Sequence, residues 1–450
     1  MANNLKVGFG RTNITPTMGI EIGGYYKVRL ADGVLDDIEV NALALSDNKR
    51  TILMVTIDHC GLAREIMDDY KNAIIEKTSV PIDAIYIHAT HSHTAPKIQP
   101  DSVTTDPLIR NYREFVKYKV VDACTFAIED LKPAKMGFGT AKAKNIAFIR
   151  RYRMKDGTVK TNPGVNNPDI VAPIGQIDEQ VCVVRFKRED GDIVLANFAD
   201  HPDTVGGNKI SGDWPTLFRH TVEKVLDNTK AIFFNGAQGD VNHVNVHPKG
   251  GDFNDMFNDF DGCSRGYGHA RHMGRVVAGA VLQIYDKVEF VDVEEIDYLQ
   301  KEYEIAHNKA TSKEELELAH KYNDLHKAGR DDLIPYTEMM LTTVVAEAAR
   351  MVALENAPDT RPLLFSAVKL GPVAFFGIPG EPFNVVGREI KKTEGYKMIM
   401  PTCLTNGSEG YYPSIDSYQE GGYEERSSKF KAGVAERMIE IGKEMLTELN

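Results

Sequence analysis

An apolar run followed directly by three histidines constrains this chain more than any other feature of its sequence. Residues Ala84 to Ile87 are typical of a buried strand, and His88, His91 and His93 follow it. Because side chains alternate along a strand, we expect His91 and His93 to point to one side and His88 to the other. Paired imidazoles at a strand end suit a metal ion, and imidazole is the commonest zinc ligand. Backbone carbonyls can satisfy the same pair, so the motif alone leaves both interpretations open.

The order of the predicted elements favours an α/β fold with a mixed sheet. Strands are expected at 40–45 and 52–57, and helices at 62–77 and 107–130. The remaining predicted elements are a hairpin at 181–198, helices at 214–227 and 269–285, a strand at 231–234, a hairpin at 363–377 and a final helix at 424–448.

Two segments stand apart from this alternation. Residues 236–268 are rich in Gly, Asn and Asp and show no periodicity, and so long a loop in a compact domain is usually functional or disordered. Residues 312–356 are charged and strongly helical, which predicts a helical insertion. No Pro-, Gly- or Ser-rich linker divides the chain, so we expect one domain over residues 1–450, with these two segments determining specificity.

Charge and hydropathy exclude several classes of function. The 450 residues are 42% hydrophobic and 26% charged, as in an ordinary globular protein, and the net charge is −12. A charge of this sign argues against a nucleic-acid partner and against a polybasic membrane-binding site. No apolar stretch approaches 18 residues, so we expect no membrane span. The expected partner is a small-molecule substrate, and the sequence is compatible with a homo-oligomer.

The cysteines and the N-terminus predict a cytoplasmic protein. Residues 1–7 contain no apolar core of a signal peptide. The five cysteines are far apart and form no Cys-x-x-Cys pair, which indicates reduced, mostly structural thiols. Cys263, in a polar Gly-rich stretch, is expected to be the most exposed of the five. We expect no cysteine to be catalytic.

Two further segments offer metal ligands. His201 ends a predicted strand, and Pro202 forces the chain out of regular structure there. Glu381 lies between a Pro-Gly turn and Pro382, where a helix is expected to begin. Each residue also has a simpler interpretation: His201 as an edge histidine facing solvent, and Glu381 as a carboxylate that complements a helix dipole.

Two glycine-rich segments complete the set. Tyr411 and Tyr423 lie among glycines in 406–424, a pattern more typical of a binding surface than of a core, and a tyrosinate can also ligate a metal. In 235–243, glycines follow a predicted strand and allow close approach to a substrate, or simply form a turn. Asp240 in this segment is a candidate carboxylate for orienting a histidine ligand.

Taken in order, these segments resemble the catalytic domain of the neutral, non-lysosomal ceramidase family. The resemblance rests on short motifs that run from the N-terminal part to about residue 425. The motifs are Thr90-His91-Ser92-His93-Thr94-Ala95-Pro96, Ala199-Asp200-His201-Pro202, Ile210-Ser211-Gly212-Asp213, Pro379-Gly380-Glu381 and the tyrosine region from Tyr411 to Glu424.

The resemblance implies a zinc hydrolase. Its four protein ligands to zinc would be His91, His201, Glu381 and Tyr411. His93 would face the scissile amide, and Tyr423 and Arg150 would polarise or hold it. The adjacent Arg151 makes the placement of Arg150 less defined than the others.

The chain also departs from the family pattern. The family's Gly-Asp-Val-Ser-Pro-Asn motif reads Gly239-Asp240-Val241-Asn242-His243 here, so Asn242 replaces a serine. The substrate-binding residues expected from this segment are Gly239, Asp240 and Asn242. The sequence ends soon after the tyrosine region, so we expect no counterpart of the family's C-terminal sandwich domain. We therefore expect a zinc-dependent amidase for a small soluble substrate; the alternatives are an ester or lactone hydrolase, or an inactive metal- or ligand-binding protein.

Overall fold

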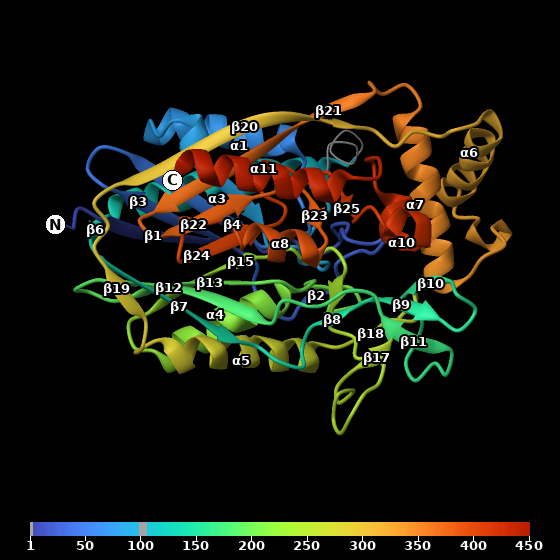
Figure 1. Ribbon diagram of the computed structural model, residues 1–450, viewed down its shortest axis with the longest axis horizontal. Coiled ribbons are helices and arrows are strands. Elements are labelled where there is room, and N and C mark those ends of the chain that lie inside the picture. The colour runs from blue at the N-terminus through green and yellow to red at the C-terminus, as the bar shows by residue number, and fades with distance from the viewer. Residues whose placement is uncertain (1–2, 99–105) are drawn as a thin grey trace.

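Three mixed sheets and the helices that cover them form the fold (Figure 1). The computed structural model describes residues 3–98 and 106–450. Each of the three sheets contains one parallel strand pair, and its other pairs are antiparallel. The predicted α/β class with mixed sheets is therefore confirmed.

The sheets combine strands from different parts of the chain. The first sheet has the order β5 (Ile85–Ala89), β4 (Thr51–Ile57), β3 (Glu39–Ser46), β1 (Lys6–Asn13) and β6 (Lys132–Pro133). The second has the order β15 (Lys230–Asn235), β13 (Ile193–Phe198), β12 (Gln180–Lys187), β7 (Lys135–Lys142) and β19 (Glu289–Val291). The third has the order β20 (Ile296–Ala306), β21 (Thr360–Leu370), β22 (Val373–Gly377) and β24 (Met398–Thr402).

One central core is shared by all three sheets. In β3, Leu43 and Leu45 enter this core together with Phe375 of the third sheet, whereas the alternate residues Ala42 and Ala44 face the opposite side. Because both faces of the strand are buried, its sequence is a continuous apolar run instead of an alternating one. The central core therefore fixes the three sheets relative to one another.

Helix pairs cover the outer face of each sheet. The pairs are α1 (Arg64–Thr78) with α3 (Pro107–Glu129) on the first sheet, α4 (Asp213–Val225) with α5 (Tyr267–Ile284) on the second, and α8 (Asn384–Ile390) with α11 (Val434–Leu449) on the third. Figure 1 shows α5 below the second sheet and α11 across the third. Helix α3 approaches β1 so closely that a Cβ at Gly8 or Gly10 would lie 2.0 Å from a helix carbonyl, which explains the two glycines in this strand.

The predicted helical segment contains two helices, α6 (Lys313–Lys327) and α7 (Glu338–Leu354), joined through the short η2 (Asp331–Leu333). They share a small core around Ile334, Val344 and Val345 and form the right-hand end of the molecule in Figure 1. The final helix expected at 424–448 is interrupted: α10 (Tyr423–Ser427) ends, and α11 begins after Gly433, whose φ of 95° is left-handed.

The remaining elements are short and lie mostly in loops. They are η1 (Ile82–Ala84), β2 (Gly33–Val34), β8 (Phe148–Ile149), β9 (Arg151–Met154), β10 (Val159–Thr161), β11 (Ile170–Pro173), β14 (Lys209–Ile210), β16 (Val241–Asn242), β17 (Phe257–Asn258), β18 (Ser264–Arg265), β23 (Glu381–Pro382), β25 (Tyr411–Tyr412) and α9 (Ser417–Glu420). Three of these strands fall within the predicted loop 236–268.

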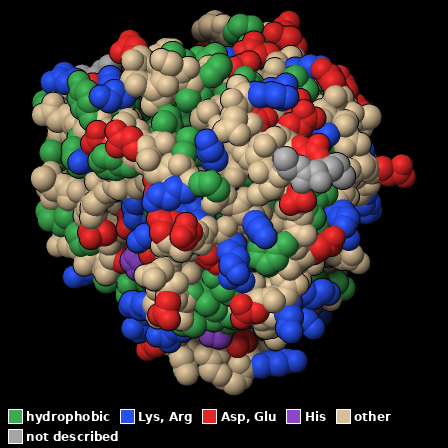
Figure 2. Space-filling view, turned by 90° about the vertical axis from the view of Figure 1, so that its left-hand side faces the viewer, with side chains coloured by type: hydrophobic (Ala, Val, Ile, Leu, Met, Phe, Trp, Pro, Cys, Tyr) green, Lys and Arg blue, Asp and Glu red, His purple; other side chains and the backbone are tan. Residues whose placement is uncertain are grey.

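Three surface features bear on the expectations from the sequence. Within the described parts of the chain, no helix is long and apolar enough to span a membrane. Figure 2 shows acidic and basic side chains interspersed over one face, where the described residues form no continuous basic surface. The expectation for Cys263 is wrong, because this residue is buried beneath its loop, and Cys60 is the most exposed of the five cysteines.

Candidate metal centre and adjoining pocket

The candidate ligands lie where parallel strands end. His91 and His93 follow β5, His201 follows β13, and Glu381 follows β22. Each of these strands belongs to the parallel pair of its sheet. Ligand sites in α/β proteins form at the carboxyl ends of parallel strands, and here three such ends meet.

His88 has a structural role. A ring nitrogen, Nδ1, lies 2.7 Å from the Cys403 carbonyl oxygen, and Nε2 accepts a hydrogen bond of 2.9 Å from the Asn235 amide. Both nitrogens are therefore used in tying the three sheets together. Strand β5 ends at Ala89, and His91 adopts a left-handed φ of 81°. Strand alternation is thus the wrong reason for the position of His91 and His93, because both residues lie in the loop beyond the strand.

Three buried side chains converge on one point. Glu381 Oε2 lies 3.2 Å from His91 Nε2 and 3.2 Å from His201 Nε2. The three atoms lie within 4.8 Å of one another and form a group suited to a metal ion. His201 Nε2 and Glu381 Oε2 are buried without a hydrogen-bond partner. Buried polar atoms are normally satisfied, and a cation between these three atoms would satisfy them.

The opposite ring nitrogens of both histidines are held by backbone carbonyls. His201 Nδ1 lies 2.8 Å from the carbonyl oxygens of Gln238 and Val241, and His91 Nδ1 contacts the Cys60 carbonyl. Because a carbonyl only accepts, each Nδ1 carries a hydrogen, and in the neutral ring the lone pair lies on Nε2, on the side of Glu381. This arrangement orients histidines for metal binding. The orienting groups are carbonyls; the carboxylate of Asp240 does not contact His201.

Electrostatics favour a cation at this point. Burial opposes ionisation of Glu381, but His91 and His201 keep its pKa well below the usual value. Burial would lower the pKa of His91, but the neighbouring Glu381 raises it well above 6.5. Burial and the Arg150 guanidinium lower the pKa of His201, which keeps that ring neutral. A proton on His91 and a metal ion therefore compete for the same carboxylate.

Tyr411 lies beside this group. The short strands β23 and β25 are parallel, and their register pairs Glu381 with Tyr411. The Tyr411 ring stacks against the His201 ring at a centroid distance of 6.4 Å. Burial, reinforced by Glu381, raises the pKa of Tyr411 well above 10, so the surrounding protein keeps the hydroxyl protonated. Ligation by Tyr411 would require the metal ion to displace that proton.

His93 lies at the edge of the group and faces the carboxylate of Asp203. Its Nε2 is 3.2 Å from His91 Nε2, and its Nδ1 is 3.6 Å from Asp203 Oδ1. Arg265 donates to both oxygens of Asp203, at 3.0 and 2.8 Å, and the Tyr25 hydroxyl donates to Oδ1. Burial lowers the pKa of His93 well below 6.5, although Asp203 acts in the opposite direction. Sequence patterns gave no signal for Asp203.

Arg150 and Tyr423 are also close to the group. Arg150 donates to Glu424 at 2.7 Å and to the Gly239 carbonyl at 2.8 Å. Its guanidinium lies 5.4 Å from the Tyr411 ring centroid and 5.9 Å from that of Tyr423. The structure thus brings Arg150, rather than its neighbour Arg151, beside the candidate ligands.

The segment expected to bind substrate, which contains Gly239, Asp240 and Asn242, lies behind His201, because the Gln238 and Val241 carbonyls contact His201 Nδ1. A Cβ at Gly239 would lie 2.5 Å from the Glu381 carbonyl oxygen, so only glycine lets this segment pack against β23. Asp240 is buried and accepts a hydrogen bond of 2.6 Å from the Asn384 amide. Asn242 donates to Asn162 Oδ1 at 2.8 Å. In these contacts all three residues support neighbouring loops.

Cys60 was missed by sequence reasoning. Its Sγ lies 3.8 Å from His91 Nδ1, and Cys60, His91 and His93 form a second, overlapping group that could hold a metal. We favour the group that contains His201 and Glu381, because all three of its residues are buried and one is a carboxylate, whereas Cys60 is only half-buried.

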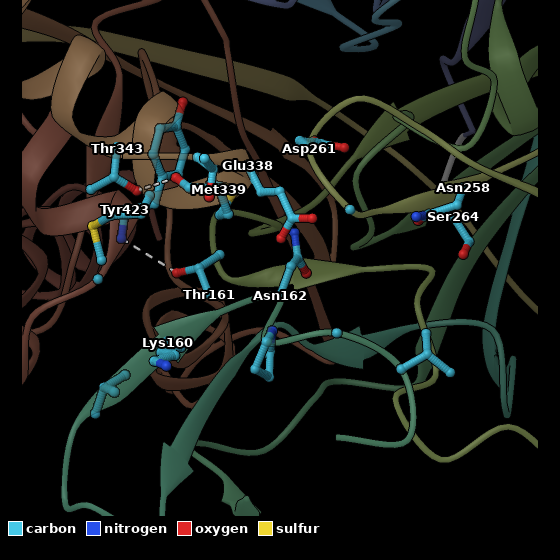
Figure 3. Close-up of a pocket in the computed structure, with 18 of the residues that line it drawn as sticks. Lys160, Thr161, Asn162, Asn258, Asp261, Ser264, Glu338, Met339, Thr343 and Tyr423 are labelled. Atoms are coloured by element: carbon cyan, nitrogen blue, oxygen red, sulfur yellow. Dashed lines mark hydrogen bonds between the residues drawn. The ribbon is translucent and has the colours of Figure 1, made fainter. Parts of the chain in front are cut away.

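A pocket of about 550 Å³ adjoins the centre through Tyr423 (Figure 3). Residues of the predicted loop (258–264) and of the helical segment (337–343) line it, together with 159–165 and 422–426. Both segments set apart in the sequence therefore contribute to its wall. A volume of this size is typical of a small-molecule site.

Comparison with solved structures connects this geometry to a known fold. The crystal structure of neutral ceramidase from Pseudomonas aeruginosa superposes with a TM-score of 0.71 at 16% identity, over 100% of this chain and 75% of that chain. The chain has the fold of neutral ceramidase. A ceramidase complexed with C2 matches with the same TM-score and identity, over 99% of this chain and 76% of that chain. No protein-family model and no curated protein matches the sequence. The predicted structural resemblance is therefore confirmed, over the whole chain.

Proposed function

We propose that this protein is a zinc-dependent hydrolase that cleaves an amide bond in a small substrate. The observation that carries the proposal is the convergence of His91 Nε2, His201 Nε2 and Glu381 Oε2, with both Nδ1 atoms held by carbonyls. Two neutral imidazoles and a carboxylate form a common donor set of catalytic zinc. Tyr411, paired with Glu381, is the proposed fourth ligand.

The proposed roles of the other residues follow from their contacts. A zinc ion held there would supply Lewis acidity and lower the pKa of a bound water to about 7. Asp203 favours a hydrogen on His93 Nδ1, which leaves Nε2 as the acceptor on the side of the ligands. His93 is therefore the proposed proton acceptor. Arg150 and Tyr423 offer hydrogen-bond donors to an oxygen on which negative charge develops.

The replacement of a serine by Asn242 does not weaken this proposal. The Asn242 side chain engages Asn162 and the Val244 amide, and is not among the side chains that converge on Glu381. The pocket beside Tyr423 suits a substrate smaller than a long-chain lipid. Esters and lactones would need the same groups and stay alternatives. Location in the cytoplasm and assembly into a homo-oligomer stay predictions from the sequence.

Metal exchange combined with a substrate panel tests the proposal. The protein is stripped with a chelator, reconstituted with zinc, and assayed on N-acyl amides, esters and lactones of graded size. We expect amide hydrolysis that requires zinc and falls as the acyl or amine part outgrows the pocket. Stoichiometric zinc without turnover on any substrate would refute the hydrolase and favour a metal- or ligand-binding protein.

A further inference from the structure

Among the described residues that line the pocket beside Tyr423, four are charged, and two of these are neutralised. Asp261 receives two hydrogen bonds from Arg265, of 2.7 and 2.8 Å. Arg426 donates to Glu347, at 3.0 Å through its Nε. Because both are paired within the protein, neither offers a free charge to a ligand.

The other two charged residues, Lys160 and Glu338, are free of such pairing. Among residues 3–98 and 106–450, no hydrogen bond or ion pair reaches the side chain of either residue. Lys160 occupies the outward position of β10, between the buried Val159 and Thr161, so its ammonium extends to solvent at the rim. Glu338 is exposed, and Figure 3 shows its carboxylate pointing into the pocket, between Asn162 and Asp261.

The backbone of Glu338 is strained. Its φ is 49°, in the left-handed region that a side chain of this size rarely adopts. Strain of this kind persists where surrounding structure enforces it, and it is concentrated at binding sites. At Glu338 this backbone strain occurs together with a carboxylate that points into the pocket and has no partner there.

Asn162 supplies a defined donor beside this carboxylate. Its Oδ1 accepts a hydrogen bond of 2.8 Å from Asn242, which leaves Nδ2 as the free end of the amide. Figure 3 shows the Asn162 side chain directed toward the same region as Glu338. Asn242, which stands where the resembled family has a serine, thus fixes the orientation of the Asn162 side-chain amide in this pocket.

We propose that the pocket selects substrates whose non-reacting end carries an ammonium group, and that Glu338 binds this group. This inference rests on the proposed function in one respect: amide hydrolysis defines which end of the substrate reacts. An unpaired carboxylate in a partly enclosed wall is stabilised more by a cation than by a neutral hydroxyl. The net charge of −12 attracts cations to the molecule at long range.

Three probes that share one scissile acetamide test the inference. N-(4-aminobutyl)acetamide carries the cation, N-pentylacetamide is its neutral isostere, and 5-acetamidopentanoate carries an anion; spacers of five and six carbons extend each series. Values of kcat/KM are measured for the zinc-loaded wild type and for Glu338→Gln. The control is Asp332→Asn, which removes an exposed carboxylate paired with Arg330 on the preceding turn, outside this pocket.

We expect the cationic probe to exceed its neutral isostere by about five- to fiftyfold in kcat/KM, the range between an exposed ion pair and a charged hydrogen bond. Glu338→Gln should abolish this preference by lowering kcat/KM of the cationic probe to that of the neutral probe. Asp332→Asn should keep the preference. Equal turnover of cationic and neutral probes by the wild type would overturn the inference and leave the hydrolase intact.

Calorimetric binding to the same proteins separates the two proposals. If no probe is hydrolysed, tighter binding of the cationic probe that Glu338→Gln removes still supports the inference, while the hydrolase fails. Absence of both turnover and a Glu338-dependent binding preference overturns the inference.

Discussion

Replacing Asp203 by Asn should disable His93 without removing the metal. Asp203 Oδ1 lies 3.6 Å from His93 Nδ1, and both side chains are largely buried. In Asp203→Asn the amide keeps the size of the carboxylate but loses its charge. Arg265 retains its two hydrogen bonds to Asp261, so the substitution does not leave this arginine without a partner.

The magnitude follows from that distance. At an effective dielectric constant of about 20, opposite charges at this separation attract by about 4–5 kcal/mol. The stabilisation is gained only when His93 accepts a proton, so its loss raises the barrier more than it weakens binding. The positive charge of Arg265 offsets part of it. We expect kcat to fall about 10²- to 10³-fold, with KM nearly unchanged.

The assay measures kcat, KM and zinc content on an amide that the wild type hydrolyses. The matched control is Asp261→Asn, which also removes a carboxylate from Arg265 but does not contact His93. Full kcat in Asp203→Asn, or an equal loss in both variants, would refute the reasoning, because the effect would then not pass through His93.

Three further predictions concern the same centre. His93→Ala should keep zinc and lose about 10²- to 10⁴-fold in kcat, as measured by elemental analysis and steady-state kinetics; loss of zinc would make His93 a ligand. Because the pKa of His91 is raised and Tyr411 must lose its proton to bind, zinc displaces up to two protons, and zinc affinity should fall about ten- to hundredfold per pH unit as pH decreases from 8 to 6 in a competition titration; a flat profile would contradict this. Alkylation of Cys60, beside His91, should slow zinc uptake, whereas Cys60→Ala should keep zinc and activity; inactivity of Cys60→Ala would indicate a catalytic thiol.

Much of the fold follows from local sequence patterns, and the exceptions have physical reasons. Strands β3 and β4 are continuous apolar runs because both of their faces are buried, and they were predicted to within one residue at each end. Strand β7 was missed because glycines and terminal lysines interrupt its pattern. Strand β20 was missed because charged and polar side chains interrupt the apolar pattern along its half-exposed length. Gly433 interrupts the predicted final helix.

The candidate site was predictable only where its residues follow strands. His91, His201 and Glu381 lie where apolar runs end, so local patterns marked them as candidate ligands, and the family resemblance alone grouped them into one set. Asp203 and Cys60 were not identified, because they approach the histidines only when loops from different sheets meet. Contacts between loops of different sheets follow no fixed spacing in the sequence, so no local pattern predicts them.

Anomalous scattering from zinc in crystals tests the central claim most directly. Data collected on both sides of the zinc absorption edge locate the ion without reference to activity. We predict one peak at about 2.0–2.2 Å from His91 Nε2, His201 Nε2 and a Glu381 oxygen, with the Tyr411 phenolate oxygen as fourth ligand. No peak at this point, or a peak bound by Cys60 and His93 in place of His201 and Glu381, would contradict the account.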